Sequence, residues 1–172
     1  MKDSFSFLRE VEPNVFIETY GVDFEDFEVG QVFEHRPGHT FSEASSLSYA
    51  GNVFDLSPGY ADQRYARRVY GDRIKVSETF VLSAMALTTK TFGKVVANLS
   101  VTDCKVEPVY VGDTLYFESA ILGKRKSKSR PDQGLLHVSS RAHNQDGAYV
   151  LSFERKLLVY RRNVGPYTAA GY

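Results

Sequence analysis

Asp55 and Tyr60, two side chains of one irregular segment, are of types that can take part in acid–base chemistry. A carboxylate can bind a water molecule and take its proton, so Asp55 is a candidate for activating water. A tyrosine with a reference pKa of about 10 is a poor base, but it can donate a hydrogen bond or a proton. Two plainer interpretations stay open: Asp55 could cap a turn beside Pro58-Gly59, and Tyr60 could pack over a helix.

Ser77 stands where a strongly apolar helix is expected to begin. The predicted helix runs from Glu78 to about Phe92 and is apolar on nearly every side, which is typical of a buried helix. Ser77 is first of all a candidate N-cap. The N–H groups and the dipole at a helix N-terminus also favour negative charge nearby.

The composition excludes several classes of protein. The chain has 172 residues, of which 42% are hydrophobic, enough for one domain with a substantial core. Its 21 basic and 21 acidic residues give no net charge, which excludes a chain-wide basic field for nucleic acid or an anionic membrane. The lone Cys104 cannot form an internal disulfide, and no histidine pair has metal-ligand spacing. Glycine-rich nucleotide motifs are absent. We expect neither a metal nor an organic cofactor.

No segment of the sequence resembles a membrane span or a secretory signal. The longest apolar stretch, Phe80 to Leu87, is interrupted by Ser83 and is far short of the roughly 20 residues that a span needs. Residues Met1 to Phe7 are not followed by the apolar run of a signal peptide. The expectation is a soluble protein, most simply a cytoplasmic one.

After Gly93 the apolar residues recur at every second position. This alternation predicts four long strands, which include the segments Val95 to Val101, Leu115 to Ile121, Leu136 to Ala142 and Tyr149 to Val159. Strands with one apolar face make a half-solvated antiparallel sheet, and the buried helix precedes them, so the sheet must wrap that helix. This is the α+β arrangement of the hot-dog fold. We expect a single such domain over residues 1–172, with its core at about 24–162.

The region before the buried helix is predicted in short pieces. A strand from Gln31 to Arg36 should end at Pro37-Gly38. A helix from about Phe41 to Asn52 should follow, with Thr40 as N-cap and Glu43 completing a capping box. A short helical stretch from Ala61 to Arg68 should end at Gly71. The first twenty residues and the tail after Arg162 have no clear period.

Several segments, in this order and spacing, resemble the MaoC-like dehydratases, which are hot-dog hydratases of coenzyme A thioesters. The resemblance covers residues 24 to 162, roughly four-fifths of the chain, and rests on Phe24–Gln31 and Pro108–Leu115. The segments Lys124–Pro131 and Asn144–Gly147 are similar to the branch that handles short branched or dicarboxylic acyl groups, such as mesaconyl-CoA.

The family's catalytic segment has the pattern Asp-x-Asn-Pro-x-His-x-Asp-x-x-Tyr-Ala, and residues 55–66 match it with two departures. Asp55, Pro58, Asp62, Tyr65 and Ala66 fall in place. Ser57 stands where the family has asparagine, and Tyr60 stands where it has the catalytic histidine. The resemblance therefore implies catalytic roles for Asp55 and Tyr60, with an incomplete acid–base pair.

The resemblance also implies a substrate, a partner and further contacts. Four residues are candidates for binding the substrate: Ser57, Ser77, Arg64 and Arg130. Ser77 is one because the family has an oxyanion hole at the start of its buried helix. Arg130 is one because it ends a basic run that could contact coenzyme A phosphates. The bland interpretation of that run, from Lys124 onward, is a solvated hairpin end. A homodimer with sites between subunits, or a higher homo-oligomer, is implied.

The implied activity is the reversible hydration of an enoyl thioester, or dehydration of a 3-hydroxyacyl thioester, on coenzyme A or a carrier protein. Two alternatives stay open. One is thioester hydrolysis or isomerisation in the same pocket. The other is a non-catalytic subunit that binds acyl chains or completes a dimer with an active homologue.

Overall fold

The computed structural model describes residues 7–71 and 73–171. The strands are β1 Leu8–Glu12, β2 Val15–Glu18, β3 Val32–Thr40, β4 Val95–Val106, β5 Thr114–Lys126, β6 Gln133–His143 and β7 Tyr149–Tyr160. The α-helices are α1 Glu43–Asn52, α2 Pro58–Ala61, α3 Gln63–Tyr70, α4 Glu78–Ser83 and α5 Pro166–Ala169. The 3₁₀ helices are η1 Phe24–Asp26 and η2 Ala84–Thr88.

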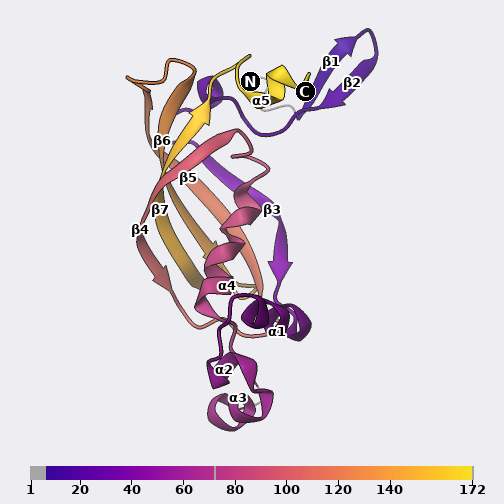
Figure 1. Cartoon of the computed structure of the whole chain (residues 1–172), viewed down its shortest axis with the longest axis vertical. Coiled ribbons are helices and arrows are strands. Elements are labelled where there is room, and N and C mark those ends of the chain that lie inside the picture. Colours follow the sequence, from indigo (N-terminus) through magenta and orange to yellow (C-terminus); the bar gives the residue numbers. More distant parts are fainter. Residues whose placement is uncertain (1–6, 72, 172) are drawn as a thin grey trace.

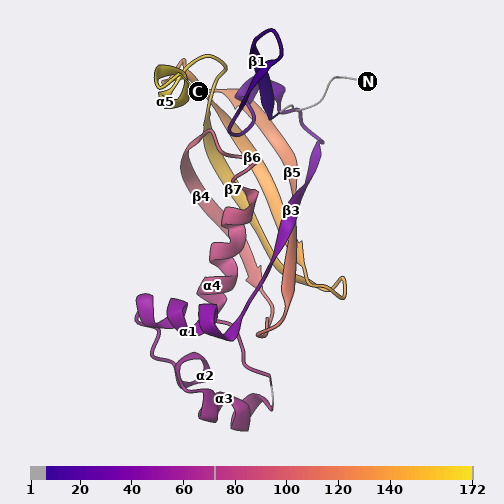
Figure 2. The ribbon, with the colours of Figure 1, turned by 90° about the vertical axis from the view of Figure 1, so that its right-hand side faces the viewer.

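The main sheet has five strands in the order β3-β5-β6-β7-β4, all paired antiparallel. The alternation predicted from the sequence is clearest in β5 and β6, where buried and partly exposed residues follow one another for eight positions. Figures 1 and 2 show the helix formed by α4 and η2 lying along one face of this curved sheet. The expected α+β arrangement, with a helix against a wrapping sheet, is therefore present.

Two groups of buried apolar side chains form the core. One lies around the first part of the helix and includes Phe41, Val81 and Phe153. The other lies around η1 and the far end of the sheet, where Phe27 stacks on Phe92 with ring centroids 5.6 Å apart. The core therefore follows the helix along the sheet, with Val81 in one group and Phe92 in the other.

The central helix is shorter and more exposed than predicted. The α-helical part ends at Ser83, and a 3₁₀ stretch continues to Thr88, so the expected end at Phe92 is wrong. Ser83 and Thr88 donate their hydroxyl hydrogens to carbonyls three residues earlier, a local bonding that competes with regular helix geometry. Ala84 is buried, whereas Thr79 and Ser83 are exposed, so the helix is not covered on every side.

The start of α1 also differs from the prediction. Ser42, rather than Thr40, is the N-cap, and its capping box is completed by Ser45 instead of Glu43. Thr40 is the last residue of β3, where its hydroxyl hydrogen-bonds to that of Thr114 at 2.7 Å. Because Thr40 pairs within the sheet, the helix begins later and Ser42, the next residue with a hydroxyl group, is its N-cap.

Strand β3 continues through Pro37-Gly38, where the sequence predicted its end. The pairing with β5 is irregular between His35 and His39, and β3 lies at the edge of the sheet. An edge strand tolerates a proline because no further strand needs its N–H group. A Cβ atom on Gly38 would come within 2.8 Å of the backbone oxygen of Leu115, so the close approach of the two strands requires glycine.

Two parts of the chain lie beyond the ends of the main sheet. β1 and β2 form a separate two-stranded hairpin in the region where the sequence showed no period. At the opposite end, α1, α2 and α3 gather beside the start of α4 (Figures 1 and 2). This helical region places the segment around Asp55 against the beginning of the central helix. In residues 7–71 and 73–171, no helix has the length and apolar character to cross a membrane.

Candidate active site

Asp55 lies in the bend between α1 and α2, with its carboxylate fixed on two sides. Its backbone N–H donates to the carbonyl of Ala50 at 2.9 Å, and the preceding Phe54 has a left-handed φ of 57°. The backbone N–H of Ser57 donates to Oδ1 of Asp55 at 3.2 Å. Ser77 donates its hydroxyl hydrogen to Oδ2 at 3.0 Å. The structure thus brings three of the predicted site residues together.

Ser77 is the N-cap of α4, as predicted, but its side chain does not cap the helix. The residue is 3% exposed and its hydroxyl hydrogen goes to Asp55. A hydroxyl has one hydrogen, so Thr79, whose Oγ1 lies 2.9 Å from Ser77 Oγ, must donate to it. A chain of hydrogen bonds therefore runs from Thr79 through Ser77 to the carboxylate of Asp55.

Tyr60, on α2, donates its hydroxyl hydrogen to Oε2 of Glu78 in the first turn of α4. The other oxygen of that carboxylate, Oε1, accepts from Nζ of Lys75. The sequence interpretation missed both Glu78 and Lys75. Their spacing of three residues around Ser77 was the available signal, but a first-turn glutamate is common because it suits the helix dipole.

The pKa values of Tyr60 and Glu78 move in opposite directions. Burial, then the hydrogen bond to Glu78 and the nearby charges of Glu78 and Asp55, raise the pKa of Tyr60. For Glu78, burial alone would raise the pKa, but the hydrogen bonds from Lys75 and Tyr60 outweigh it and the pKa is lowered. Tyr60 therefore stays protonated and Glu78 stays ionised near neutral pH.

The remaining predicted substrate contacts lie elsewhere. Ser57 is exposed at the start of α2, next to Asp55, and Arg64 is exposed on α3. Arg130 is exposed in the hairpin between β5 and β6, at the end of β5 remote from Thr114 and α1. The 13 residues of β5 span about 40 Å, so one chain does not bring Arg130 to Asp55. Within the basic run, Lys124 serves the fold by donating to the carbonyls of Glu25 and Phe27.

A separate row of buried polar residues crosses the sheet under η2. His35 hydrogen-bonds to Ser119 at 3.0 Å and to Thr91 at 3.3 Å. Burial, with smaller contributions from the charges of Arg155 and Arg36, lowers the pKa of His35 to about 4. Arg155 is 5% exposed and donates to Thr88 at 3.1 Å.

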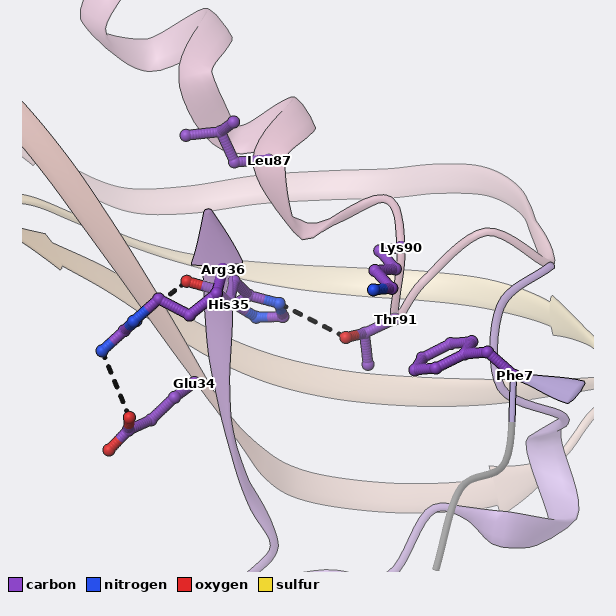
Figure 3. A pocket seen from close by; sticks show the side chains of 7 residues that line it. All are labelled: Phe7, Glu34, His35, Arg36, Leu87, Lys90 and Thr91. Atoms are coloured by element: carbon purple, nitrogen blue, oxygen red, sulfur yellow. Dashed lines mark hydrogen bonds and ion pairs between the residues drawn. The ribbon is translucent and has the colours of Figure 1, made fainter. Parts of the chain in front are cut away.

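His35 and Thr91 also line a cavity of about 180 Å³ (Figure 3). The other residues around it are Phe7, Glu34, Arg36, Leu87 and Lys90. Asp55 and Tyr60 are not among them, and the cavity borders the end of the helix remote from Ser77. It is therefore distinct from the Asp55 cluster, which is formed by Asp55, Ser77, Tyr60 and Glu78. No group of three or more metal-binding side chains is found in the part of the chain that the structure describes.

Comparisons with known proteins identify the relatives of this chain. The family model described as mesaconyl-CoA hydratase matches residues 3–171. The mesaconyl-CoA hydratase of Cereibacter sphaeroides is 30% identical in an alignment of length 149 that covers 81% of this chain and 41% of that protein. The chain therefore spans about two-fifths of that relative's length.

Solved structures agree with the fold. A MaoC domain protein dehydratase from Chloroflexus aurantiacus superposes with a TM-score of 0.77 and 26% identity, over 85% of this chain and 42% of that one. A conserved Mycobacterium tuberculosis protein described as a double hot-dog fold gives a TM-score of 0.72 and 27% identity, over 85% and 46% of the two chains. The predicted hot-dog fold is confirmed. The match along nearly its whole length shows that this chain belongs to the mesaconyl-CoA hydratase family of MaoC-like proteins.

Proposed function

We propose that this chain catalyses the reversible addition of water to an enoyl thioester, giving a 3-hydroxyacyl thioester. One observation carries the proposal: the carboxylate of Asp55 is held by Ser77 and by the N–H of Ser57, in the same cluster as Tyr60. Membership of a family described as mesaconyl-CoA hydratase supports this reaction and favours coenzyme A as the thiol. The reaction as proposed uses no metal and no organic cofactor.

Hydration requires three tasks, and the cluster offers groups for each. A base must activate water for attack at the β-carbon, and an acid must protonate the α-carbon on the same face. Asp55 can perform both in turn. Donors must also hold the thioester oxygen as it takes up charge. Because the hydroxyl hydrogen of Ser77 is given to Asp55, that task falls to the backbone N–H groups in the first turn of α4.

A second candidate function is a non-catalytic partner that binds acyl thioesters beside an active subunit. Two observations favour it. Tyr60 occupies the position of the family's catalytic histidine, and the chain corresponds to less than half of a double hot-dog protein. In this alternative the same cluster would hold the thioester without turnover.

We also propose that the chain assembles as a homodimer. β4 is an edge strand, and its side chains Leu99 and Val101 are 52% and 41% exposed. An exposed edge with apolar side chains is a template for pairing with another chain. A dimer would bring two copies of the fold together, as many as the double hot-dog relative carries in one chain. A monomeric mass in light scattering at micromolar concentration would contradict this assembly.

One assay separates the functional alternatives. The purified protein is incubated with crotonyl-CoA and mesaconyl-CoA while the enoyl absorbance and free thiol are followed together. Loss of enoyl absorbance without thiol supports hydration, and thiol release supports thioester hydrolysis. Saturable binding without either change supports the non-catalytic partner. Repeating the assay with enoyl thioesters of an acyl carrier protein shows whether the protein prefers coenzyme A or a carrier protein as the thiol of its substrate.

A further inference from the structure

The hydrogen bond from Tyr60 to Glu78 fixes the direction in which the tyrosine can act. A phenol carries one hydrogen, and here it is donated to Oε2 of Glu78. The hydroxyl of Tyr60 therefore has no hydrogen left for a water molecule or a thioester. Its oxygen can still accept a hydrogen bond. Tyr60 is thus an acceptor towards the site, which differs from the donor role that its residue type first suggested.

The carboxylate of Glu78 is itself held in one orientation. Its Oε1 accepts from Lys75, which can only donate, and its Oε2 accepts from Tyr60. The side chain of Lys75 is 21% exposed and that of Glu78 is 46% exposed, so the pair is shielded from water mainly on the lysine side. Each carboxylate oxygen has its own partner. An exchange of either oxygen for an N–H group would disturb the arrangement.

We propose that Glu78 is a positioning residue for hydration, acting through Tyr60 in the place of the family's histidine. This inference rests on the proposed function. Because Glu78 accepts the only hydroxyl hydrogen of Tyr60, the phenol oxygen can act towards the site only as an acceptor. The phenol oxygen and the carboxylate of Asp55 are then two acceptors that together orient one water molecule.

The chemical step then balances within the site. Asp55 takes one proton from the water while the water oxygen forms its bond to the β-carbon. The π-electron pair moves to the α-carbon, which takes the same proton back from Asp55 on the same face. The second hydrogen of the water, directed at Tyr60, stays on the new hydroxyl group. Asp55, Tyr60 and Glu78 end the cycle unchanged.

The substitution Glu78→Gln tests this role because it reverses the bond to Tyr60. Lys75 requires an acceptor, so the amide oxygen stays beside it and the NH₂ group faces Tyr60. Tyr60 then accepts from the amide and turns its own hydrogen to the site. We expect kcat with crotonyl-CoA or mesaconyl-CoA to fall about tenfold or more, with KM changed less than about threefold.

Glu43→Gln is the matched control. Glu43 is the first-turn glutamate of α1 and faces Arg67 at 3.9 Å, so the change removes a helix-terminal charge without touching Tyr60. Its kcat should stay within about twofold of wild type. Thermal unfolding of both variants shows whether either loses the fold. An equal loss of kcat in both would overturn the inference.

The decisive measurement is the double variant Glu78→Gln with Tyr60→Phe. If Glu78 acts only through the phenol, the double variant is no slower than Tyr60→Phe alone. If instead the kcat losses of the two single variants multiply in the double variant, the inference is overturned and the proposed function still stands. A wild-type protein without any turnover would overturn the proposed function and this inference with it.

Discussion

Ser77 donates its hydroxyl hydrogen to Oδ2 of Asp55 at 3.0 Å, joining two residues that lie 22 positions apart in the chain. The bond uses a residue at the position of a helix cap to orient a carboxylate in a neighbouring bend. It links the start of the central helix to the segment that resembles the family's catalytic motif. The proposed chemistry depends on this link, and the first predictions test it.

Asp55→Asn should lower kcat by at least about a hundredfold while the protein stays folded. The amide has nearly the same shape but cannot take a proton from water, and a positioned acid or base typically contributes 10²- to 10⁴-fold. Steady-state kinetics with a short enoyl-CoA measures the loss. Asp62→Asn is the matched control, because an asparagine can still cap α3 by accepting from Tyr65. Unchanged turnover in Asp55→Asn would place the chemistry elsewhere.

Ser77→Ala should lower kcat by about tenfold because Asp55 loses the hydrogen bond that orients it. The loss of a partly buried bond to a charged group should also destabilise the fold, by about 1.5 kcal/mol. Kinetics and urea unfolding measure the two effects separately. Ser83→Ala, in the same helix and exposed, is the comparison variant and should retain full activity. Equal kinetics in the two variants would dissociate Ser77 from the site.

Tyr60→His should raise hydratase turnover of simple enoyl-CoAs by about tenfold or more, because an imidazole can exchange protons near neutral pH. The neighbouring carboxylate of Glu78 would accept from one ring nitrogen and leave the other facing the site. Initial rates of crotonyl-CoA hydration from pH 6 to 9 measure the change. A variant slower than wild type across this range would show that the site is adapted to tyrosine.

His35 should make the folded protein less stable in mild acid. Its pKa is lowered from 6.5 to about 4 by burial first and by the charges of Arg155 and Arg36 second. In the unfolded chain His35 binds a proton below about pH 6.5, whereas in the folded chain it does so only below about pH 4. Stability relative to neutral pH is lost over this window, by about 3 kcal/mol at its lower end.

Urea unfolding at pH 7.5, 6 and 5 checks the dependence on His35. His35→Gln lacks the titrating group and can still hydrogen-bond to Ser119, so its profile should be flatter. A profile as steep in the variant as in the wild type would assign the effect to other groups.

Gly134→Ala should destabilise the fold by about 1–3 kcal/mol. A Cβ atom at this position in β6 would come within 2.2 Å of the ring of Phe24, which is buried. Gly123→Ala in the adjacent strand β5 is the matched control, because its nearest neighbour would be His137 Cβ at 3.5 Å. Chemical unfolding of both variants should separate them by at least about 1 kcal/mol. Equal stabilities would show that Phe24 moves aside freely.

The sequence by itself determined the strands of the sheet and the start of the central helix. Alternation in the segments that became β5, β6 and β7 requires strands with one buried face, and that pattern is local in the chain. The residues around Asp55 could be placed in one segment because the resemblance covers consecutive positions. Local signals failed where a second element competed, as when β3 took Thr40 from the cap of α1.

Only the tertiary structure decided how the candidate site works. Whether Ser77 caps its helix or orients Asp55 depends on the path of a chain segment 22 residues away. The same holds for Glu78, which looked like an ordinary first-turn glutamate until α2 brought Tyr60 to it. Arg130, in contrast, does not join the candidate site, because it follows β5 at the end of the sheet remote from Asp55. A hydrogen bond needs two partners within about 3 Å, and residues far apart in sequence meet that condition only through the fold.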